Sequence, residues 1–244
     1  MFSIRKAFKL KKKVSVIIIS VFSFLIFCCS DSCTDFTKES KKGIKQITDA
    51  LQAHGEANKA FAKAKLKDAQ SFQNWAEFEK IRLQCPPEQY FDSFFHKKIM
   101  KITDIMIKTD SELVEAYYEA AVAYDRAVEK YLKLCDDDGN PAEEIKAVEL
   151  YSKAAKSYVE AAKERLEFTR EYKFYCSMQR NLILKKSLGA PDKKPYKFDE
   201  CAMRARVLDF QVRAINEEVK ADEIYVRSLL GFIRNLEGCK EKSK

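Results

Sequence analysis

The stretch from Leu113 to Ala162, LVEAYYEAAVAYDRAVEKYLKLCDDDGNPAEEIKAVELYSKAAKSYVEAA, decides the fold that the sequence predicts. Before and after its acidic turn, apolar or small residues recur at alternating steps of four and three, which is the spacing of a heptad seam. Large tyrosines alternate with small alanines, so a tyrosine of one helix can pack over an alanine of the other. We expect a helical hairpin with these buried positions: Leu113, Tyr117, Ala120, Tyr124, Ala127, Tyr131 and Leu134, then Val148, Tyr151, Ala155, Tyr158 and Ala162.

The composition of the 244-residue chain favours helices throughout. Charged residues make up 34% and hydrophobic residues 46%, and only 6 Gly and 5 Pro interrupt them. Such a composition is typical of long amphipathic helices and offers no flexible linker between domains. We therefore expect an all-α fold, an elongated antiparallel bundle of three to four long coiled-coil helices, in a single domain of residues 33–244.

The net charge of +8 is concentrated at the start of the chain. Residues 1–32 hold six basic residues and one acidic residue, and the rest of the chain holds 39 basic and 36 acidic residues. Proteins that bind nucleic acid usually carry a strong basic excess on the folded domain. The nearly balanced charge of residues 33–244 therefore argues against nucleic acid as a partner.

The first 32 residues are typical of an export signal. A basic segment, residues 1–13, precedes sixteen apolar or small residues from Val14 to Cys29. Sixteen residues are fewer than the ~20 that span a bilayer as a helix, which favours a cleaved signal, with cleavage before Cys33, over a permanent anchor. The alternatives are a bacterial lipoprotein signal, with lipid attached to Cys28 or Cys29, and a mis-assigned start codon. With a cleaved signal, a signal anchor or a lipoprotein signal, the protein is exported, as a secreted or membrane-associated cell-surface protein; only a mis-assigned start codon would leave it inside the cell.

Four long helices are expected, at about residues 36–83, 88–134, 141–188 and 198–236. Cys85-Pro86-Pro87 ends the first, because proline lacks the amide donor and restricts the residue before it. Asn140-Pro141 begins the third with a cap and a proline at the first helical position. Gly238 is expected to end the fourth. The first helix has only a thin apolar stripe: Ile44, Ile47, Leu51, His54, Phe61 and Phe72.

The last helix has the longest seam, and its spacing predicts a coiled-coil contact with a neighbouring helix or with a second copy of the chain. Because an apolar surface of this length usually marks an interface, we expect a homodimer to which this helix contributes. The one charged position, Asp222, is expected to face solvent, with a role in setting the register as the alternative. The seam positions are Cys201, Ala205, Leu208, Val212, Ile215, Val219, Asp222, Val226, Leu229, Ile233 and Leu236.

Motifs for chemistry are weak. Asp136-Asp137-Asp138-Gly139 fails the calcium-loop pattern, because the required acid six residues after the glycine is replaced by Ile145. His54 and His96 lack a second histidine or a glutamate at metal-ligand spacing. The sequence has no glycine-rich phosphate loop and no paired Cys-x-x-Cys. We therefore expect a protein that is not an enzyme and that holds no cofactor or metal.

Six cysteines remain after cleavage before Cys33, and an even number in an exported protein suggests disulfides. In an up-down bundle Cys85 and Cys201 lie at one end, and Cys135 and Cys239 at the other. These two pairs are the disulfide candidates, and free buried thiols are the alternative.

The stretch AYDRAVEKYLKLCDDDGNPAEEIKAVELYSKAAKSYVEAA, from Ala123 to Ala162, resembles the middle hairpin of BAR-domain proteins. The last helix, RARVLDFQVRAINEEVKADEIYVRSLLGFIRNLE, is similar to the closing BAR helix, which follows a proline-interrupted connection. BAR modules form antiparallel dimers that press a curved basic face on anionic membranes, and the resemblance implies the same activity here. Together with an export signal, it implies a membrane or cell-surface layer outside the cell.

Two functions follow. The first is a non-enzymatic BAR-like dimeric scaffold that binds an anionic membrane surface or a surface-layer protein. The second is a secreted or lipid-anchored helical bundle that binds a protein partner. A continuous basic surface favours the first and scattered charge favours the second. The candidate membrane contacts are Lys97, Lys98, Lys101, Lys185, Lys186, Lys193, Lys194, Lys197, Arg204 and Arg206.

Overall fold

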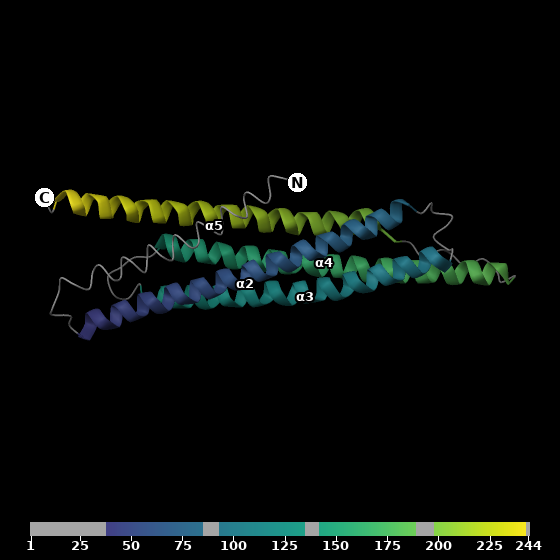
Figure 1. Ribbon diagram of the computed structural model, residues 1–244, viewed down its shortest axis with the longest axis horizontal. Helices are drawn as coiled ribbons and strands as arrows, with labels where there is room; N and C mark the ends of the chain where they lie inside the picture. The colour runs from purple at the N-terminus through teal and green to yellow at the C-terminus, as the bar shows by residue number, and fades with distance from the viewer. Residues whose placement is uncertain (1–37, 85–92, 135–141, 189–197, 243–244) are drawn as a thin grey trace. The chain divides into compact units, whose positions relative to one another are not determined.

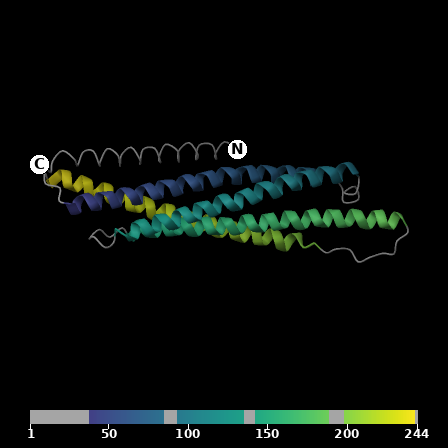
Figure 2. The ribbon, with the colours of Figure 1, turned by 90° about the horizontal axis from the view of Figure 1, so that it is seen from below.

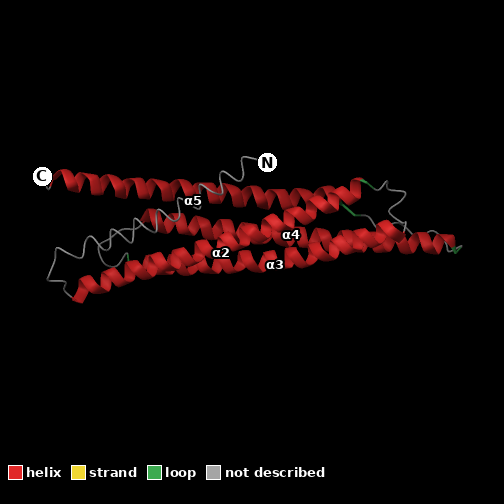
Figure 3. Cartoon of the chain, in the orientation of Figure 1, coloured by secondary structure: helices red, strands yellow, loops and turns green. Residues whose placement is uncertain are grey.

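A computed structural model describes residues 38–84, 93–134, 142–188 and 198–242. Over these ranges the chain is helical and contains no strand, which confirms the all-α class (Figures 1 and 3). The chain divides into two compact units, Met1–Lys45 and Gln46–Lys244. The first contributes only the beginning of one helix to the described residues. The packing described below belongs to the second unit.

The four helices lie close to the predicted ranges: α2 (Lys38–Leu83), α3 (Ser93–Leu132), α4 (Ala142–Ser187) and α5 (Glu200–Lys242). Asp199 caps α5, because its Oδ1 accepts a hydrogen bond from the Ala202 backbone nitrogen at 3.0 Å. The prediction that Gly238 ends the last helix is wrong, since α5 continues to Lys242. A single glycine costs a helix only about 1 kcal/mol, and the charged helix formers after it allow the helix to go on.

Neighbouring helices run antiparallel in the second unit (Figure 2). Side-chain bonds show the direction, because residue numbers rise along one helix as they fall along its partner. These bonds join Asn58 to Tyr124 and Asn74 to Thr109 between α2 and α3, Asp125 to Ser152 and Asp104 to Lys173 between α3 and α4, and Tyr151 to Asp222 and Glu164 to Arg206 between α4 and α5.

The tyrosine and alanine seam forms the larger core cluster, as predicted. Its hairpin positions from Leu113 to Tyr131 and from Val148 to Ala162 are buried, and Leu134 is half-buried against them. The rings of Tyr117 and Tyr158 stack with centroids 4.8 Å apart, and those of Tyr124 and Tyr151 stack at 5.4 Å. Small residues beside these rings let α3 and α4 approach closely.

A second core cluster lies toward the end at which α3 begins and α4 ends. It uses aromatic, aliphatic and sulfur-containing side chains instead of alanine. Trp75 packs against it, with its ring 4.9 Å from that of Phe168. The buried members are Phe78, Ile99, Ile102, Met106, Phe168, Tyr172, Cys176 and Met203.

The predicted stripe of α2 is partly wrong. His54 and Phe61 are buried, but Ile44, Ile47 and Phe72 are about half exposed. The buried face consists mainly of Ala50, Ala57, Ala64 and polar residues. These small side chains leave room for the tyrosine rings of α3 and α4. The hydroxyls of Tyr117 and Tyr124 of α3 donate hydrogen bonds to Asp68 and Asn58 of α2.

Most described positions of the predicted α5 seam are not buried in the bundle, although Asp222 and Leu229 are half-buried. Its positions Leu208, Val212, Ile215, Val219 and Val226 are between 49% and 59% exposed. The side chains of Ile233 and Leu236 lie outside the described residues. A different stripe of α5 is buried: Met203, Val207, Ala214 and Ala221.

Polar contacts select this other face. Tyr151 and Tyr158 of α4 donate to Asp222 at 2.5 Å and to Glu218 at 2.9 Å. Lys65 of α2 also binds Glu218, at 2.8 Å. The expectation that Asp222 faces solvent is therefore wrong, because it is half-buried and bonded to Tyr151.

Candidate functional site

The candidate lysines occupy one end of the α3 and α4 pair. Lys97, Lys98 and Lys101 are exposed on the first turns of α3, and Lys185 is exposed near the end of α4. The two groups share this end because Ser177 of α4 lies against Met100 of α3, with its Oγ 3.9 Å from the sulfur. Lys186 lies in α4, but its side chain is outside the described part of the chain, as are Lys193, Lys194 and Lys197 altogether.

Arg204 and Arg206 belong instead to the contacts that hold α5 in place. Arg204 forms ion pairs with Glu79 of α2 and with Glu200, the latter at 2.8 Å. Arg206 donates to Glu164 of α4 at 2.8 Å, and this hydrogen bond raises the pKa of the guanidinium. Because both arginines already face carboxylates, we do not group them with the exposed lysines.

The described part of the lysine-rich end has no acidic residue between residues 93 and 103 or between residues 172 and 188. These two segments, the start of α3 and the end of α4 with the residue after it, include seven Lys or Arg. Exposed apolar side chains lie among these charges, and the sequence analysis did not predict them: Phe94, Phe174, Ile183, Leu184 and Leu188. The absence of acid from both segments was a signal available in the sequence.

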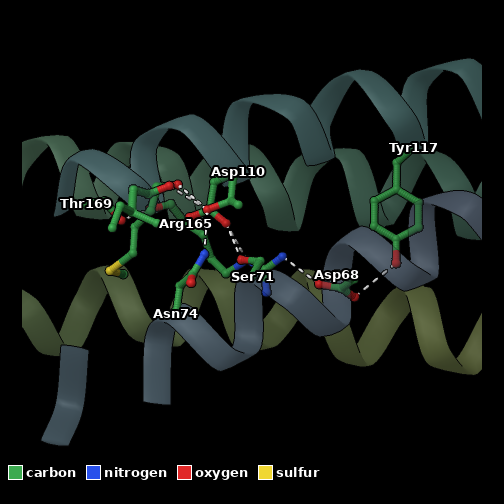
Figure 4. A network of polar contacts seen from close by, with 10 residues as sticks. Asp68, Ser71, Asn74, Asp110, Tyr117, Arg165 and Thr169 are labelled. Atoms are coloured by element: carbon green, nitrogen blue, oxygen red, sulfur yellow. Dashed lines mark hydrogen bonds and ion pairs between the residues drawn. The ribbon is translucent and has the colours of Figure 1, made fainter. Parts of the chain in front are cut away.

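A buried polar network joins α2, α3 and α4 (Figure 4). Arg165 of α4 donates to Asp68 of α2 at 2.7 Å, and Tyr117 donates to the other oxygen of Asp68 at 3.0 Å. Ser71 donates to Asp110, which lies 4.0 Å from Arg165. Burial raises the pKa of Asp110, and the Arg165 guanidinium opposes that rise. The network connects three helices through charge-assisted bonds.

Sequence reasoning did not find this network. Its signal was a charged residue at a core position, since Asp110 follows Met106 by four residues and precedes Leu113 by three. Asp68, Asp110 and Arg165 are each at most 9% exposed. A substrate cannot reach groups so enclosed. We assign the network a structural role, in which opposite charges on three helices fix the register of these helices.

The two histidines are buried on separate helices. His54 lies among the rings of Tyr124, Tyr131, Tyr151 and Tyr225, with its Nδ1 3.3 Å from the Tyr131 hydroxyl. Burial lowers the pKa of His54 to about 4. For His96, on α3, burial and the charge of Arg180 lower the pKa.

Other features of the described residues offer little chemistry. Among them, no group of three or more His, Cys, Asp or Glu is placed to hold a metal ion. No described helix is long and apolar enough to cross a membrane. A shallow, open hollow between α3 and α4 is lined mainly by charges, and two of these, Asp125 and Lys156, pair at 2.9 Å. The predicted turn at residues 136–139 lies outside the described residues.

The cysteine predictions fall largely outside the described side chains. Cys201 is exposed near the start of α5 and forms no disulfide with another described cysteine; Cys176 is buried, and burial raises its pKa to about 11. Cys85, Cys135 and the side chain of Cys239 are not described, so both disulfide pairs stay predictions. The same holds for the export signal and for lipid attachment to Cys28 or Cys29.

Comparisons with known proteins add no relative. No protein-family model matches the chain, and neither the curated proteins nor the solved structures include a match. Among the described residues, the α5 seam and the lysine-rich end of α3 and α4 are exposed surfaces that could bind a partner.

Proposed function

We propose that the protein is a non-enzymatic helical scaffold that acts as a homodimer at a membrane or cell-surface layer, joined through α5. The observation that carries this proposal is the exposed α5 seam. Five aliphatic positions from Leu208 to Val226 keep heptad spacing over 18 residues, about 27 Å of helix, yet none of the other described helices buries them. Exposed apolar rows of this length usually mark an interface.

A second copy of α5 fits the seam when it runs antiparallel. A two-fold axis near Glu217 places Leu208 opposite Val226 of the second copy and Ile215 opposite Val219. The same register brings Asp209 near the height of Arg227, and Arg213 near Glu223. Opposite charges beside an apolar seam favour one partner and one direction.

Neighbouring apolar residues widen this surface. Lys65 of α2 binds Glu218 of α5. Near it lie Leu66, the next residue, and Phe72, which follows Lys65 by seven residues, about two turns, on the same side of the helix. Both are at least half exposed. A partner helix over the α5 seam would therefore also cover part of α2.

Sedimentation equilibrium tests the dimer. The chain of residues 33–244 contains the whole second unit, and reducing conditions prevent a dimer through Cys201. We expect twice the chain mass at concentrations of tens of micromolar, and one chain mass for the double variant Ile215→Glu, Val219→Glu. Tyr118→Glu, an exposed aromatic position on α3, is the matched control and should stay dimeric.

A single chain mass for the unchanged sequence would remove the dimer. The seam would then be available to a helix of another protein, which is the alternative function. Folding of each variant is checked by circular dichroism, since half-exposed positions tolerate charge with little loss of stability.

A further inference from the structure

The described end of α3 and α4 reaches beyond the other two helices. Lys173 of α4 binds Asp104 of α3 at 2.5 Å, and Ser177 lies against Met100 one turn closer to the end. Near the same level α2 ends at Leu83, and α5 begins at Glu200, where Arg82 and Glu200 pair at 2.8 Å. The first turns of α3 and the last three turns of α4 thus form a two-helix projection.

Charge and apolar exposure coincide on this projection. Asp104 is the first acid on α3, and α4 has none after Glu171. Phe94 is 58% exposed, with the Lys98 ammonium 4.4 Å above its ring, and Leu188 is 85% exposed. Apolar side chains held among lysines are the composition of segments that lie in the interface of an anionic bilayer.

We propose that this projection docks on a bilayer that contains anionic phospholipid. Lys97, Lys98, Lys101 and Lys185 face the headgroups, while Phe94 and Leu188 enter the boundary between headgroups and acyl chains. The inference deepens the proposed function, because it names the membrane surface and the part of the protein that contacts it. It does not require the dimer.

Lipid fits this end better than other anionic partners. A second copy of the same end would bring like charges together, which is unfavourable. Nucleic acid would use the lysines but leave the aliphatic side chains of α4 in water. A bilayer surface suits both the lysines and the apolar side chains. Each Lys or Arg near an anionic surface contributes about 1 kcal/mol to binding, and transfer of apolar groups out of water is also favourable.

Vesicle co-sedimentation tests the proposal with residues 33–244, because the apolar segment 14–29 would bind lipid by itself. The probes are phosphatidylcholine vesicles with and without roughly one third phosphatidylglycerol. We expect binding to the anionic vesicles only, weakened but not abolished by added salt, because salt screens the lysines and not the apolar contacts.

Two variants separate the contributions. Lys97→Glu, Lys98→Glu, Lys101→Glu together should weaken binding about a hundredfold or more. Phe94→Ser with Leu188→Ser should remove the salt-resistant part. The matched control reverses three exposed lysines elsewhere, Lys59, Lys130 and Lys133, and should bind as the unchanged chain does.

The outcomes separate this inference from the dimer. Failure of the unchanged chain to bind anionic vesicles, or an equal loss in the control, overturns the docking surface even if the protein is dimeric. Unchanged salt-resistant binding in the serine variant overturns apolar insertion. If the protein is monomeric and binds anionic vesicles through these lysines, the docking surface is supported and the dimer is ruled out.

Discussion

The two heptad seams of the chain have the same spacing but opposite environments. The tyrosine and alanine seam of α3 and α4 is buried, with Ala120 and Ala127 fully enclosed, whereas the α5 seam is about half exposed. Heptad spacing therefore identifies a face that can pack, but not which surface packs on it. In this bundle the buried face of α5 is chosen by tyrosine hydroxyls that reach its carboxylates.

The largest expected difference between the seams comes from one added charge. Ala120→Glu or Ala127→Glu places an unpaired carboxylate in the core and should lower the free energy of unfolding by about 3 to 5 kcal/mol. Ile215→Glu in the α5 seam should cost less than about 1 kcal/mol in the isolated bundle. Urea unfolding followed by circular dichroism measures these values.

Glu129→Ala is the control for this experiment, because Glu129 is exposed on the same helix as the two alanines. It should change the free energy of unfolding by no more than about 0.5 kcal/mol. If Ala120→Glu, Ala127→Glu and Glu129→Ala unfold at the same urea concentration, the assignment of the buried seam is wrong.

The stability of the protein should also depend on pH, because His54 of α2 is buried against the tyrosines of the buried seam. Burial lowers the pKa of His54 from 6.5 to about 4, so the unfolded chain binds a proton at a higher pH than the folded chain does. The contribution of the neutral His54 ring to the free energy of unfolding is therefore fully present above pH 6.5 and is lost as the pH falls toward 4. The full loss amounts to about 3 kcal/mol.

His54→Phe should remove this contribution, since phenylalanine does not titrate and fits among the four tyrosine rings. The difference in unfolding free energy between the two proteins, measured from about pH 7 to pH 4.5, isolates it from the titration of carboxylates. A difference that stays constant over this range would show that His54 does not titrate as its burial requires.

Much of the fold could be predicted from the sequence because local signals are strong. Prolines at 86, 87 and 141 separate the helices, and the tyrosine and alanine spacing locates the main core. The buried face of α2 could not be read in the same way. Its core side chains are alanines and polar residues such as Asp68, which carry little apolar signal and become core only because partners on two other helices enclose them.

The candidate surfaces were predicted in part for the same reason. The lysines were found because charge is visible in a sequence, but the exposure of Phe94 and Leu188 depends on where the neighbouring helices end. The separation of Arg204 from the lysines also required the structure, because its partner Glu79 is more than a hundred residues away. Contacts between distant segments leave no local pattern.

The smallest expected change in stability gives the most direct comparison of the two faces of α5, because the same substitution, Val to Ala, is made on each face. Val207 is 8% exposed on the inner face of α5 and Val212 is 55% exposed in the seam. Val207→Ala should lower the free energy of unfolding by about 1 to 2 kcal/mol, through lost burial and an incompletely filled cavity. Val212→Ala should change it by less than about 0.5 kcal/mol at sub-micromolar concentration, where association contributes least. In sedimentation the order should reverse, with Val212→Ala weakening the dimer and Val207→Ala leaving it intact. Equal costs in unfolding would mean that both faces of α5 are covered within one chain, and the comparison between the two seams would fail.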